Sequence, residues 1–116
     1  MVRLAALLGF AAVALGAFGA HGLRDRVSPA MLEVYRTGVL YHLVHAVVLL
    51  AVALGARQLR RPRFIAGFFV AGIAVFSGSL YALALTEVRM LGAITPFGGA
   101  AFLIGWALLV AERAPA

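Results

Sequence analysis

Two histidines, His42 and His45, lie three residues apart in an otherwise apolar stretch of this chain. At this spacing two imidazoles can share one side of an α-helix and bind one metal ion. His21, at the end of another apolar stretch, could supply a third nitrogen, and a histidine near a membrane edge could also relay protons. No carboxylate or thiolate lies at the same depth to complete a metal site. We therefore expect no metal and no cofactor, and histidines that bond to tyrosine, serine or backbone groups.

Six further polar side chains occupy the apolar stretches of the chain: Thr37, Tyr41, Ser77, Ser79, Tyr81 and Thr95. Tyr41 and His45 are about one helical turn apart, as are Ser77 and Tyr81, so each pair would share a helix face. Ser77, His45 and Tyr81 are of catalytic residue types. However, no acid in these stretches could orient a histidine, and no nucleophile-elbow motif occurs. We therefore expect no enzymatic activity.

The stretches that carry these residues are long and uncharged, which is typical of membrane-spanning helices. Hydrophobic residues make up 65% of the 116-residue chain, against roughly 45–50% apolar residues in soluble domains. A bilayer core of about 30 Å needs roughly 20 mostly apolar residues per helix. Four runs approach or exceed this length: 4–20, 38–56, 64–85 and 91–111. The predicted fold is an all-α integral membrane protein, in which one domain forms an up-and-down bundle of four transmembrane helices.

Two of the four runs contain signals for where a helix begins or bends. Ser28 followed by Pro29 is typical of a helix start, because serine caps free amides and proline suits the first helical position. The second helix is therefore predicted to begin near Pro29, with an interfacial extension over 29–37. In the fourth run, Pro96 either kinks the helix or begins it with Thr95 as the cap.

The depth of the polar side chains is predicted by alternating the direction of the four helices. All nine polar residues named above then fall in one half of the membrane, on the side away from the loop 57–63. Polar groups within a bilayer usually face the bundle interior and find partners there. We therefore expect a shared pocket or a hydrogen-bonded network near the outer surface.

Small residues at spacings of three or four allow helices to approach closely in lipid, where the hydrophobic effect does not drive their association. The first run contains Ala5, Gly9, Ala12, Gly16 and Gly19. The third run contains a stripe made of Gly67, Ala71, Ala74, Gly78 and Ala82. The second run has few small residues at such spacings. We therefore expect the first and third helices to pack closely, with the second and fourth around them.

The charge of the chain is concentrated in arginines, ten of which stand against four acids, for a formal net charge of +6. Four of them lie in one short loop: Arg57, Arg60, Arg61 and Arg63. A basic loop beside apolar runs is typical of a topology signal or an anionic-lipid contact. We expect no nucleic-acid binding, since no large aqueous face is available. With four spans, both termini share this loop's side, which has six arginines against four and is predicted to be cytoplasmic.

Four segments, which together touch all four runs, resemble one protein family: GAFGAHGL (16–23), TGVLYHLVHAV (37–47), FSGSLYALAL (76–85) and TPFGGAAFLIGW (95–106). They are similar, in the same order, to uncharacterised-protein family 0382, also called domain of unknown function 423. The resemblance implies a small four-helix protein of the bacterial inner membrane, with no particular activity. The positions that match its pattern are His21, Tyr41, His45, Ser77, Ser79, Tyr81, Thr95, Pro96, Gly98 and Gly99. His42 departs from the pattern, which often has glutamine there.

Two functions remain open at the level of sequence. The first, which we expect, is a structural or accessory membrane component that associates with its own copies or with a larger complex through small-residue helix faces. The alternative is a binder or conduit for a lipid, quinone, metal or proton, acting through the polar residues of the outer half.

Overall fold

A computed structural model describes residues 1–112, so Arg113, one of the arginines counted above, lies outside the described residues. Within them the fold is all-α, as predicted, and four continuous helical segments are long and apolar enough to cross a membrane. Their elements are α1 (Val2–Phe18) with the π-helical turn η1 (Gly19–Leu23); α2 (Pro29–Leu54); α3 (Pro62–Gly72), η3 (Ile73–Ser77, also π-helical) and α4 (Gly78–Thr86); and α5 (Met90–Val110). A short 3₁₀ turn, η2 (Ala56–Gln58), lies between α2 and α3.

Local sequence explains where α2 and α5 begin. The Ser28 side chain accepts a hydrogen bond of 3.2 Å from the backbone N–H of Met31, and α2 begins at Pro29. In contrast, α5 begins at Met90 and passes through Pro96. Of the two alternatives for the fourth span, the structure therefore has the proline inside the helix.

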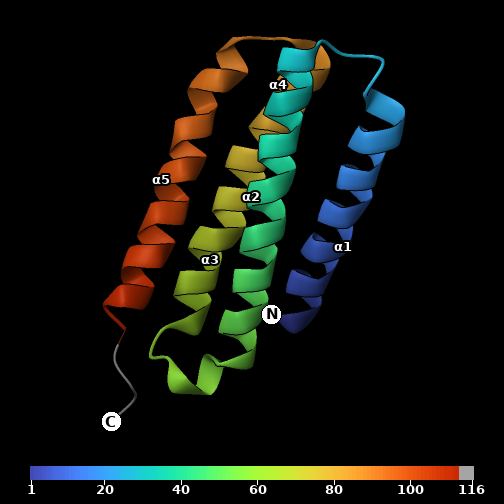
Figure 1. The fold of residues 1–116 in the computed structure, drawn as a ribbon. Helices are drawn as coiled ribbons and strands as arrows, with labels where there is room; N and C mark the ends of the chain where they lie inside the picture. Colours follow the sequence, from blue (N-terminus) through green and yellow to red (C-terminus); the bar gives the residue numbers. More distant parts are fainter. Residues whose placement is uncertain (113–116) are drawn as a thin grey trace.

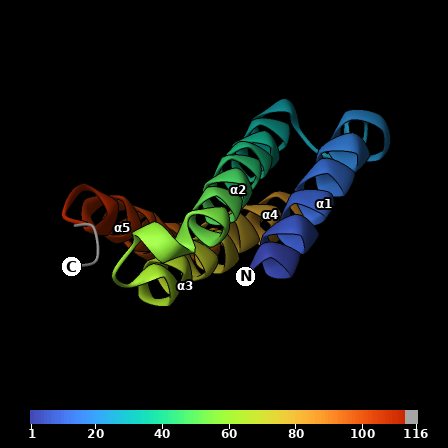
Figure 2. The ribbon, with the colours of Figure 1, turned by 90° about the horizontal axis from the view of Figure 1, so that it is seen from below.

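The four segments form a flattened bundle. They alternate in direction, so the N-terminus, the end of α5 and the α2–α3 loop lie at one end, which we call the loop end (Figure 1). Seen along the bundle, α1 and α5 lie on opposite sides, with α2, α3 and α4 between them (Figure 2). The extents of 54 × 26 × 16 Å show the flattening: the bundle is clearly wider in one direction than in the other.

The predicted close pairing of the first and third helices is wrong. The structure packs α1 along α2, while α3 packs mainly against α5 and, less extensively, α2. Gly16 and Gly19, which were assigned to that pairing, meet Val39 and Tyr35 of α2 instead. The physical reason is that small side chains permit close approach but do not determine which helix approaches. Bulky residues of α2 fill the space beside these two glycines.

A close helix contact joins the third span to α5, where glycines and phenylalanines alternate across the interface. We call this the glycine–phenylalanine seam; it consists of Phe69, Gly72, Phe76, Gly98, Phe102 and Gly105. A Cβ atom built on Gly72 would lie 2.3 Å from the Phe102 ring, and one on Gly105 would lie 2.8 Å from the Phe69 ring. A Cβ atom on Gly98 would lie 2.2 Å from the backbone nitrogen of Phe76. Helix α5 therefore rests directly on the backbone of η3 at this point.

The remaining glycines assigned to packing have no such neighbour. A Cβ atom on Gly9, Gly67 or Gly78 would meet nothing within 4 Å among the described residues. Gly72 and Gly105 do leave room for a residue of the neighbouring helix. Neither was among the predicted packing positions. Glycine alone therefore does not mark a packed interface.

Candidate functional site

Helix α2 lies at the centre of the polar residues and is joined to each neighbouring segment by a side-chain hydrogen bond. Toward α1, the Tyr35 hydroxyl donates to the carbonyl of Leu15 at 2.5 Å. Toward η3, the Ser77 hydroxyl donates to the carbonyl of Gly38 at 2.7 Å. Both Tyr35 and Ser77 are fully buried, so these bonds satisfy polar groups that would otherwise be costly in an apolar interior.

His45 joins α2 to α5 and uses both of its ring nitrogens. Nδ1 lies 2.7 Å from the Tyr41 carbonyl oxygen, which can only accept, so Nδ1 carries the proton. Nε2 lies 3.1 Å from Nε1 of Trp106, which can only donate, so Nε2 accepts. The ring also stacks on Phe102, with centroids 3.6 Å apart. With its free lone pair already bonded to Trp106, His45 has none to offer a metal ion in this arrangement.

His42 faces a different neighbour from His45. Its Nδ1 lies 2.8 Å from the hydroxyl of Tyr81 in α4, with the donor set by the tautomer. Its Nε2 is buried without a hydrogen-bond partner among the described residues. Since His42 points to α4 and His45 to α5, the two imidazoles do not converge on one ion.

A further pair of hydroxyls joins α4 to α5. Ser79 Oγ and Thr95 Oγ1 lie 2.6 Å apart, and either can donate. Ser79 also donates to the carbonyl of Phe76 in its own segment at 2.9 Å. The Thr95 hydroxyl can also donate to the carbonyl of Leu91 in its own helix at 3.3 Å. Each hydroxyl carries one hydrogen, so either Ser79 donates to Phe76 and Thr95 to Ser79, or Thr95 donates to Leu91 and Ser79 to Thr95.

Three predicted site residues stay outside this network of side-chain bonds between helices. His21 is exposed in η1. Thr37 is exposed and donates to the Glu33 carbonyl of its own helix at 3.0 Å. Tyr41 is also exposed, and its ring packs on Phe76 with centroids 4.7 Å apart. The nine residues therefore form separate bonded pairs and single side chains, not one shared pocket.

A groove lies between α2 and α5. Of the nine predicted site residues, all of which are described, only Tyr41 and His45 line it. The groove measures about 470 Å³, and its other lining residues are Phe76, Pro96, Gly99, Ala100, Phe102, Leu103 and Trp106. Its walls are largely aromatic and aliphatic. Within residues 1–112, no three histidine, cysteine or acidic side chains lie close enough together to hold a metal ion. His21 therefore does not join His42 and His45.

Comparison with known proteins identifies the family. The family model described as "Protein of unknown function (DUF423)" matches residues 15–99. The chain is 48% identical to the UPF0382 membrane protein YwdK of Bacillus subtilis, over 94% of this chain and 91% of that protein. It is also 47% identical to a UPF0382 membrane protein of Haemophilus influenzae (90% and 86% covered) and 39% identical to the UPF0382 inner membrane protein YgdD of Escherichia coli (95% and 86% covered).

The chain belongs to the DUF423 family. No solved structure matches it. Together with the four long apolar helices, the family names of these relatives establish that the chain is a membrane protein.

Sequence reasoning missed several residues that complete the bonded pairs in this DUF423 chain. Tyr35 was overlooked because it lies in the predicted interfacial extension, yet it is 1% exposed and bonds to α1. Trp106 was left outside the site because aromatic residues in membrane helices commonly anchor the helix or fill packing gaps. Gly38 contributes only its backbone carbonyl, and a residue type gives no signal for that role.

Proposed function

We propose that this protein is a non-enzymatic accessory component of the bacterial inner membrane. It associates with another transmembrane helix, in a homo-oligomer or a larger membrane complex, through a small-residue surface. That surface, which we call the open face, consists of Gly67, Ala71, Ala74 and Gly78 in the third span. The observation that carries this proposal is that the open face is uncovered, while the opposite side of the same span is sealed by the glycine–phenylalanine seam.

The open face supports helix association by its shape. Gly67, Ala71 and Ala74 are exposed, and Gly67 and Gly78 have no neighbour within 4 Å of a built Cβ atom. Three residues of the open face, Gly67, Ala71 and Ala74, line a groove of about 600 Å³ together with the start of α1. Helix α1 packs mainly on α2, and only the residues at its start, Met1 and Leu4, reach this groove.

The chemistry of the open face favours a helix as its occupant. In lipid, helices associate through close van der Waals contact, and faces of glycine and alanine allow two backbones to approach. A span needs no small residues on a side that faces only lipid, where larger apolar side chains serve equally well. Four small residues spaced four, three and four apart in an uncovered position therefore fit a partner helix.

The polar residues support this role over that of a binder or conduit for a lipid, quinone, metal or proton. His45, Ser77, Ser79 and Thr95 each bond to another segment of the same chain. Such bonds hold the helices of one subunit together and occupy these four side chains. In this proposal the loop end, with both termini, faces the cytoplasm, as the excess of arginines there favours.

Native mass spectrometry of gently extracted protein tests the proposal. We expect the wild-type chain in a species heavier than one subunit, and the double variant Gly67→Leu with Ala71→Leu as a single subunit, because leucines would hold a partner helix away. The matched control, Ala14→Leu, enlarges an exposed alanine of α1 and should leave the assembly intact. A wild-type chain that is monomeric at every extraction condition, or a double variant that assembles normally, would contradict the proposal.

A further inference from the structure

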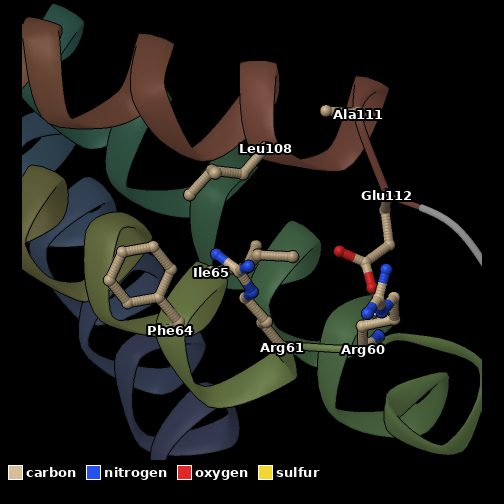
Figure 3. Close-up of a pocket in the computed structure, with 7 residues that line it drawn as sticks. All are labelled: Arg60, Arg61, Phe64, Ile65, Leu108, Ala111 and Glu112. Carbon is tan, nitrogen blue, oxygen red and sulfur yellow. Dashed lines mark hydrogen bonds between the residues drawn. The ribbon is translucent and has the colours of Figure 1, made fainter. Parts of the chain in front are cut away.

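At the loop end, a pocket lies between the start of α3 and the end of α5, and none of its lining residues belongs to the open face. It measures about 210 Å³, and its lining residues are Arg60, Arg61, Phe64, Ile65, Leu108, Ala111 and Glu112. Figure 3 shows Arg61 reaching over the apolar side chains, while the Glu112 carboxylate points toward Arg60. The pocket therefore has an apolar floor and a charged rim.

We propose that this pocket binds the head group of one anionic phospholipid. The phosphate would lie on the guanidinium groups of Arg60 and Arg61, and the start of an acyl chain would lie along Phe64. This inference concerns a different surface from the proposed helix partner and does not rest on it.

The position of the pocket fits a lipid. It lies where α3 begins and α5 ends, which are the limits of two membrane-spanning segments and therefore the level of the lipid head groups. Ile65 is buried and forms the floor, while Phe64 is 52% exposed on the outer surface. An amphiphile can thus place its charged part on the rim and its apolar part on Phe64 without leaving the bilayer.

The charge of the pocket fits an anion. Four arginines lie between positions 57 and 63, and Glu112 is the only acid that lines the pocket among the described residues. Its carboxylate accepts a hydrogen bond from the backbone N–H of Arg60 and keeps its one negative charge, which the two lining arginines exceed. This bond ties the loop to the end of α5 and leaves both arginine side chains free of it. A guanidinium group presents planar paired donors that match phosphate oxygens, and basic pockets between membrane helices commonly hold anionic head groups.

Lipid binding to the purified full-length chain tests this site. The probes are dioleoylphosphatidylglycerol, which is anionic, and dioleoylphosphatidylcholine, which has the same chains and no net charge. We expect native mass spectrometry to show one phosphatidylglycerol retained in preference to phosphatidylcholine. Arg61→Gln should weaken that binding about fivefold, since one arginine near an anionic head group contributes about 1 kcal/mol.

Arg57→Gln is the matched control, because Arg57 lies in the same loop and does not line the pocket. It should weaken binding clearly less than Arg61→Gln. Equal weakening by both variants would show a diffuse effect of the basic loop and overturn the proposal, as would equal retention of the two lipids. A third outcome would also overturn the proposal: the wild-type chain retains no lipid but self-associates, and Arg61→Gln abolishes this self-association. The pocket would then bind a second copy of the chain. Because Arg61 is exposed, circular dichroism is expected to show an unchanged helical fold in both variants.

Discussion

The two faces of the third span both contain glycine, but these glycines have different surroundings. On the sealed face, which packs on α5, Gly72 contacts the Phe102 ring and the backbone of Phe76 lies against Gly98. On the open face, Gly67 and Gly78 have no neighbour within 4 Å of a built Cβ atom. The sealed face holds the subunit together, and we infer that the open face is available to a partner. The role of a glycine in this helix thus depends on what faces it.

The largest expected effect on this comparison comes from Gly98→Ala. A Cβ atom at this position would lie 2.2 Å from a backbone nitrogen that no side-chain rotation can move, so α5 must shift away from η3. We expect the free energy of unfolding in detergent to fall by about 3 kcal/mol or more, as for severe overpacking. The measurement is a denaturant titration followed by circular dichroism. Gly78→Ala, the control on the open face, should leave the free energy of unfolding unchanged within about 0.5 kcal/mol. Equal loss in both variants would mean that the two faces do not differ.

A smaller effect is expected from Trp106→Phe, which removes the donor to Nε2 of His45. His45 is 4% exposed, so its ring nitrogen would be left buried and unbonded, at a cost of about 1–3 kcal/mol. The same denaturant titration measures this loss. Adding His45→Phe should recover part of it, because replacing both partners removes the unpaired group. If the double variant is as unstable as the sum of the single variants, the bond does not couple α2 to α5.

The fold could be predicted from sequence because four uncharged runs of sufficient length leave few alternatives in a membrane. The start of α2 could also be predicted, since the signal at Ser28 and Pro29 is local. Which helices pack against each other could not be predicted from the sequence. Gly9 and Gly72 look alike in sequence, but only the fold places a phenylalanine ring beside Gly72. Spacing gives the face of a helix and says nothing about what that face meets.

The polar residues of the candidate site show the same limit. His45, Ser77 and Thr95 were identified because polar groups in apolar runs need partners. The partners of Ser77 and His45 were not identified, because they are the Gly38 carbonyl and the Trp106 ring, neither of which has a distinctive pattern. Depth in the membrane also suggested one shared pocket. The structure divides the same residues among separate helix contacts, because His42 and His45 point to different neighbours.

The most direct test of the open face is photo-cross-linking in native membranes. A photoreactive benzoylphenylalanine in place of Ala71 lies on the open face, and the same group in place of Ala14 lies on the exposed side of α1. Our account predicts that illumination joins position 71 to protein, giving an adduct of one discrete mass, and that position 14 gives no such adduct. Adducts with lipid alone at position 71, or the same protein adduct from both positions, would contradict the conclusion that the third span has one sealed face and one face for a partner.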